Sequence, residues 1–165
     1  MDIARLILIL NAVLMLATCN QVKKKDAIEY NDFLNSAMDP LVSKMLDFEE
    51  AIYTEDRKKL YALHAELVKF THETRLKIIE KPAFDGNEAL KNSILLIADF
   101  YKSIAENDYH QIIKIIESQE GLLTHEKADE IEKMISKIYD KENEYYNLLE
   151  NETNAYSKKY NIAFE

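Results

Sequence analysis

The scarcity of glycine and proline constrains this chain most, because its 165 residues include only two of each. Sheet-based domains need turn residues about every 8–12 positions, and this chain lacks them. Few turns in a chain of this length mean long helices. Hydrophobic residues make up 47% of the chain and charged residues 31%, which is enough to fill the core of one domain. We therefore expect an all-α fold.

Apolar residues spaced three and four apart predict four helices, over about residues 26–53, 55–80, 88–119 and 125–160. Thr54 and Thr124 are the expected N-caps of the second and fourth helices. Pro40 interrupts the first helix, which is expected to be kinked or split there, with Asp39 as the cap of its second half. Short loops between long amphipathic helices predict an antiparallel four-helix up-down bundle formed by residues 26–165.

The first 18 residues read as a secretory signal. Arg5 is followed by an apolar run over residues 6–16. Such a run is shorter than the roughly 20 residues that span a bilayer, and it fits the apolar region of about 7–15 residues in a signal peptide. A plain signal peptide, or an N-terminal helix with a buried cysteine, would explain the same run.

The junction that follows consists of Leu16, Ala17, Thr18 and Cys19. These four residues resemble the lipobox of bacterial lipoproteins, although Thr18 stands where Gly, Ala or Ser is usual. The resemblance implies that the Cys19 thiol receives diacylglycerol and that cleavage occurs between Thr18 and Cys19. It places the protein in the bacterial cell envelope, lipid-anchored to a membrane. Asn20, in place of Asp, favours the outer membrane.

Residues 19–25 are then expected to be a short tether that reaches at most about 25 Å. The helical layout with a loop of Pro82, Ala83, Phe84, Asp85 and Gly86 also resembles uncharacterised helical surface lipoproteins of Gram-negative bacteria, a resemblance that implies no activity. This loop is expected at the bundle end nearest the membrane. Phe84 is the candidate contact residue for an envelope protein or lipid, and a packing role at the end of the bundle explains it equally well.

Composition and motifs exclude several classes of activity. A net charge of −9 repels phosphate backbones, so nucleic acid is not an expected partner. The single cysteine excludes an intramolecular disulfide and a Cys-rich zinc site. No acidic residue stands three positions before any of the histidines, as a di-iron bundle requires; these histidines are His64, His72, His110 and His125. We expect no metal, no cofactor and no enzymatic activity.

The resulting hypothesis is a non-catalytic envelope lipoprotein that serves as a protein-interaction or structural module. The alternative is a ligand- or metal-binding helical bundle in the periplasm that uses interior polar residues, for which the candidates are His64, His72 and Glu142. Tyr145, Tyr156 and Tyr160 lie on the apolar seam of the last helix and are expected to pack in it.

Overall fold

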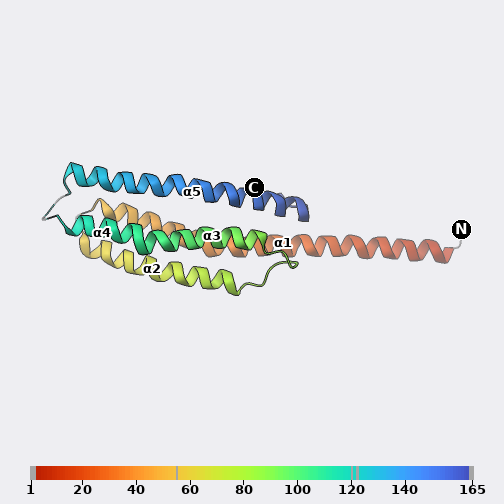
Figure 1. Ribbon diagram of the computed structural model, residues 1–165. Helices are drawn as coiled ribbons and strands as arrows, with labels where there is room; N and C mark the ends of the chain where they lie inside the picture. Colours follow the sequence, from red (N-terminus) through yellow and green to blue (C-terminus); the bar gives the residue numbers. More distant parts are fainter. Residues whose placement is uncertain (1–2, 55, 120, 122, 164–165) are drawn as a thin grey trace.

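The computed structural model describes residues 3–54, 56–119, 121 and 123–163, with side chains from residue 23 onward. Its elements are α1 (Ile3–Ile52), α2 (Arg57–Glu80), α3 (Ala89–Ser103), the π-helical turn η1 (Ile104–Asp108), α4 (Tyr109–Glu117) and α5 (His125–Tyr160). The helix continues from α3 through η1 into α4. The long helices lie side by side along a common axis (Figure 1). The prediction of an all-α helical bundle is confirmed.

Helix α1 differs from the prediction in two ways. It runs unbroken through Pro40, so the predicted split into two helices is wrong. Pro40 and Ser36 are both exposed, so the Ser36 carbonyl that loses its amide partner can bond to water instead. The helix also begins at Ile3, and residues 19–25 therefore belong to it. Seven helical residues span only about 10 Å, which is much less than an extended tether.

The helix ends follow local capping chemistry. The Asp56 side chain accepts a hydrogen bond from the Lys59 amide at 2.9 Å and caps α2. The Thr54 hydroxyl instead donates to the Ala51 carbonyl at 2.9 Å, at the end of α1, so the prediction of Thr54 as the cap is wrong. Thr124 caps α5 as predicted, accepting from the Lys127 amide. A carboxylate is as good a cap as a hydroxyl, and two candidates two residues apart cannot be ranked by type alone.

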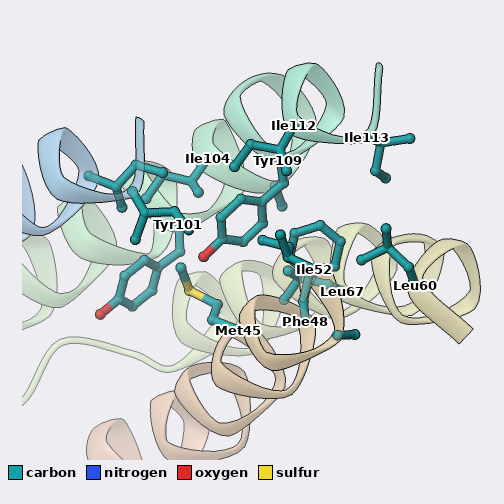
Figure 2. Close-up of a cluster of buried hydrophobic side chains, with 14 of the residues drawn as sticks. Met45, Phe48, Ile52, Leu60, Leu67, Tyr101, Ile104, Tyr109, Ile112 and Ile113 are labelled. Carbon is teal, nitrogen blue, oxygen red and sulfur yellow. The ribbon is translucent and has the colours of Figure 1, made fainter. Parts of the chain in front are cut away.

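Two apolar clusters fill the interior. The larger cluster joins all the helices (Figure 2), with Phe48, Leu67, Ile97, Tyr109 and Ile135 among its buried members. The smaller cluster contains the buried residues Tyr30, Leu34, Ile94, Tyr156 and Tyr160. Tyr145 packs against the larger cluster. The predicted packing role of Tyr145, Tyr156 and Tyr160 is therefore confirmed.

Polar contacts define the two ends of the bundle. We call the end that contains the loop before α3 the proximal end and the opposite end the distal end. At the proximal end, the Asp85 carboxylate lies 3.5 Å from the Lys23 ammonium and 3.8 Å from the Lys159 ammonium. At the distal end, the Arg57 guanidinium donates to the carbonyls of Gln119 at 2.7 Å and Gly121 at 3.0 Å. The N-terminal part of α1 extends past the proximal end without a neighbouring helix (Figure 1). The loop before α3 therefore shares its end of the bundle with the point where α1 emerges.

Candidate functional site

The predicted lipidation site lies on the projecting part of α1. Thr18 and Cys19 belong to the helical backbone of this segment, and their side chains lie outside the described part of the structure. Among the described residues, no helix is both long and apolar enough to cross a membrane. The first side chain of α1 with a described contact is Lys23, four residues after Cys19, and it pairs with Asp85.

Three chain segments meet at Asp85 beside this point. Its carboxylate pairs with Lys23 and Lys159 and accepts a hydrogen bond from the Tyr160 hydroxyl at 3.3 Å. The charge of Lys23 lowers the pKa of Asp85. Asp85 and Gly86 both have a positive φ, of 52° and 70°, which turns the chain sharply before α3. The loop is thus tied to the first and last helices by charge.

Phe84 closes the proximal end of the bundle. Its ring lies 5.1 Å from Tyr160, 5.7 Å from Tyr30 and 6.2 Å from Tyr156, measured between ring centroids. The side chain is half-buried against the smaller apolar cluster. These contacts account for Phe84 as a packing residue, and its predicted role as a contact for a partner stays a prediction.

A shallow pocket of about 340 Å³ lies beside Phe84, lined in part by Asp26, Tyr30 and Lys81. Tyr30 is 4% exposed, and among the described residues no group lies in full hydrogen-bond geometry with its hydroxyl. The hydroxyl is itself shielded from solvent. A molecule in the pocket would therefore meet mainly the ring of Tyr30, not its hydroxyl.

The two histidines considered as interior ligands, of which His64 is half-buried and His72 is exposed, have partners within the chain. The His64 imidazole Nε2 lies 2.7 Å from the Ala105 carbonyl oxygen, and the His72 Nε2 lies 2.8 Å from the Glu106 carboxylate. The two rings thus engage different groups on η1. In the described part of the chain, no three His, Cys, Asp or Glu side chains are grouped so as to hold a metal ion.

The turn η1 is the part of the helix that His64 contacts. The Tyr109 amide bonds to the Ile104 carbonyl, five residues back instead of four. Such a shift leaves a nearby carbonyl without its helical amide, and the His64 ring supplies a donor to the carbonyl of Ala105. The same shift places Tyr109 on the buried face after Ile104 and Ala105, because five residues here complete the turn. The spacing between these buried residues was visible in the sequence, and the prediction of one regular helix missed it.

Two glutamates accept hydrogen bonds from tyrosines between α1, α3–α4 and α5. Glu49, only 9% exposed, accepts from the hydroxyls of Tyr109 and Tyr139. Glu142 accepts from Tyr101, and the Tyr101 hydroxyl lies 2.8 Å from that of Tyr146. We call these residues the tyrosine–glutamate cluster: Glu49, Tyr101, Tyr109, Tyr139, Glu142 and Tyr146. Glu142 stood out in the sequence as a carboxylate on an apolar seam; Glu49, directly after Phe48, carried the same signal and was missed.

The surroundings of Tyr101, Tyr109 and Tyr139 raise the pKa of their hydroxyls and so keep them protonated. Burial is the main cause that raises the pKa of Tyr101 and of Tyr109 far above the usual value. The hydrogen bond to Glu49 is the first cause that raises the pKa of Tyr139 to about 12. A tyrosine with a raised pKa is a hydrogen-bond donor at neutral pH, not a nucleophile or base. The arrangement can hold helices together and can present aromatic rings and carboxylates.

The larger described cavity, of about 420 Å³, lies at the distal end between the loops. Ile52, Tyr53, Arg57, Ile116 and Leu123 contribute to its lining. Another cavity, of about 330 Å³, lies between α3–α4 and α5, with Phe100, Met134 and Lys137 among its residues. His64, His72 and Glu142 line none of these described cavities. Comparison with protein-family models, with curated proteins and with solved structures gave no match.

Proposed function

We propose that the protein is a non-catalytic lipoprotein of the bacterial cell envelope, anchored to the outer membrane through Cys19, and that its bundle is a protein-interaction or structural module. The observation that carries this proposal is the placement of the apolar run. Residues 6–16 lie on the part of α1 that extends beyond every other helix (Figure 1). An uncovered apolar helix of this length is costly in water. A leader that is inserted into a membrane and then removed at Cys19 resolves that cost.

The contacts at the proximal end fit the same proposal. After cleavage, three residues separate the lipidated Cys19 from Lys23, which already pairs with the body at Asp85. The bundle would then sit directly on the membrane surface, with Lys23, Lys24 and Lys25 at the level of the head groups. The alternative, a ligand- or metal-binding bundle, has less support, because the described polar groups at His64, His72 and Glu142 bond within the chain.

Metabolic labelling with a clickable fatty acid tests the anchor. Cells that express the wild type, Cys19→Ala and Phe84→Ala are labelled, and the protein is followed through membrane fractionation. We expect label and membrane association in the wild type and in Phe84→Ala, and the loss of both in Cys19→Ala. Equal label in the wild type and Cys19→Ala would contradict the proposal. Phe84→Ala is the matched control, because it alters the bundle end and leaves the acylation site intact.

A further inference from the structure

The seam between α1 and α5 differs from the other seams of the bundle. The backbones of these two helices approach each other closely at few places, in contrast to α1 with α2 and α3 with α5. Ala27 meets Tyr156 near one end, and Glu49 meets Tyr139 further along. The two helices therefore flank one long seam, and side chains of the tyrosine–glutamate cluster span it.

One row of side chains on each helix borders this seam. On α1 the row repeats at spacings of three and four and contains Asp39, Val42, Leu46, Glu49 and Tyr53. On α5 the spacings are four and three, and the row contains Glu132, Ser136, Tyr139, Asn143, Tyr146 and Glu150. Residues at these spacings share one face of a helix. The rows face each other at Glu49 and Tyr139, and the charges of Glu132 and Glu49 add to burial in raising the pKa of Tyr53.

These rows expose apolar surface. The exposed fraction is 56% for both Leu46 and Tyr53, 41% for Tyr139 and 40% for Tyr146. Large side chains with this exposure, gathered along one seam, are typical of protein-binding surfaces, where tyrosine is enriched. We call this surface the α1–α5 face; it comprises the two rows and Glu142.

The negative charge of the α1–α5 face indicates which kind of partner can bind there. Its charged residues are Asp39, Glu49, Glu132, Glu142 and Glu150, and neither row contains a lysine or arginine. Two of the other seams carry cations that pair locally: Lys44 pairs with Glu66 between α1 and α2, and Arg75 pairs with Asp99 between α2 and α3. The acidic groups of the α1–α5 face lack such a counter-charge from within the rows. A second copy of the chain would bring the same negative charge to the face and be repelled.

We infer that the α1–α5 face binds a basic amphipathic helix of a partner protein, with the partner's apolar stripe over Leu46 and Tyr146 and its lysines or arginines against the glutamates. Tyrosine rings beside carboxylates suit such cations, because the ring face and the carboxylate attract the same charge. The inference rests on the proposed protein-interaction role and names the surface and the chemistry of the partner.

A peptide of defined sequence tests the inference. The probe is a 20-residue helical peptide with leucines on one face, lysines on the other and a single tryptophan; the counter-probe has glutamate in place of every lysine. Because the chain has no tryptophan, the tryptophan emission comes from the peptide alone and reports its burial. The full chain is used in the form in which cells yield it, with empty nanodiscs as the blank if it is lipidated. We expect the basic peptide to bind with a blue shift and the acidic peptide not to bind.

Two pairs of variants locate the site. Leu46→Ala with Tyr146→Ala should weaken binding by about tenfold, whereas Leu76→Ala with Leu96→Ala, exposed residues of α2 and α3, should have no effect. Glu132→Gln with Glu150→Gln should weaken binding more than Glu73→Gln with Glu80→Gln, which changes the net charge equally. Circular dichroism of each variant checks that the fold is kept.

Equal loss in the two charge-matched pairs would mean non-specific attraction and would overturn the inference. Binding that only Phe84→Ala weakens would place the contact at the proximal end instead. A dimer that Leu46→Ala with Tyr146→Ala dissociates would make a second copy the occupant and also overturn it. None of these results depends on the label at Cys19, so failure of the anchor proposal and failure of this inference can be told apart.

Discussion

The α2–α3 seam and the α1–α5 seam are held together by different kinds of contact. Between α2 and α3, aliphatic side chains such as Leu67 and Ile97 are buried, with 0% and 2% exposed, and ion pairs lie outside them. Between α1 and α5, the Tyr139 hydroxyl donates to the Glu49 carboxylate across the gap. Apolar contact stabilises a seam without specifying a partner atom, whereas each hydrogen bond requires one. The first seam is expected to carry more stability, and the second to be more sensitive to single atoms and to pH.

The largest expected effect comes from truncating the apolar seam. Leu67→Ala and Ile97→Ala should each lower the free energy of unfolding by about 2–5 kcal/mol, because each leaves a cavity in a close-packed interior. Urea unfolding followed by far-UV circular dichroism measures this. The matched control is Leu76→Ala, 54% exposed on α2, with an expected change within about 0.5 kcal/mol. Near-zero effects at both Leu67 and Ile97 would contradict the assignment of this seam.

Removing Glu49, which accepts hydrogen bonds from Tyr139 on α5 and Tyr109 on α4, should cost less. Glu49→Leu leaves the buried Tyr109 hydroxyl without its acceptor, and an unsatisfied buried donor costs about 1–3 kcal/mol. Adding Tyr109→Phe should restore much of the lost stability, because the orphaned donor is then removed as well. Unfolding of the two single variants and the double variant gives the coupling energy. Additive losses would show that Glu49 and Tyr109 do not depend on each other.

The buried residues of the apolar seam could be predicted from the sequence, whereas most hydrogen bonds of the polar seam could not. The three-and-four spacing marked Leu67 and Ile97 as core residues, because it depends only on the geometry of a single helix. The pairing of Glu49 with Tyr139 joins residues 90 positions apart and depends on the register between helices, which no local pattern fixes. The π-helical turn was not predicted because it changes the spacing of the buried residues for only one turn of the helix. Thr54 was the expected cap of α2, but Asp56 also has a side chain that can cap a helix, so residue type did not decide between them.

The two seams should also differ in their response to alkali. The pKa of Tyr139 is raised from 10.0 to about 12, first by its hydrogen bond to Glu49. A folded pKa above the unfolded one means that the stabilisation is complete below pH 10 and is lost as the pH rises from 10 towards 12. Tyr139→Phe should therefore flatten the loss of stability over this interval. Chemical denaturation at several pH values measures it, and an unchanged slope in Tyr139→Phe would contradict the prediction. Glu49→Gln should lower the Tyr139 pKa towards its usual value.

The smallest effect is expected at the outer rim of the apolar seam, where Arg75 pairs with Asp99. The side chains of these residues are 37% and 47% exposed, so water and salt screen the pair, and exposed pairs contribute about 0–1 kcal/mol. A double-mutant cycle with Arg75→Ala and Asp99→Ala should give a coupling energy in this range that falls further in about 1 M salt. A coupling above about 2 kcal/mol would mean that charge, and not apolar burial, holds α2 to α3. The contrast between the two seams would then disappear, because both would depend on specific polar partners.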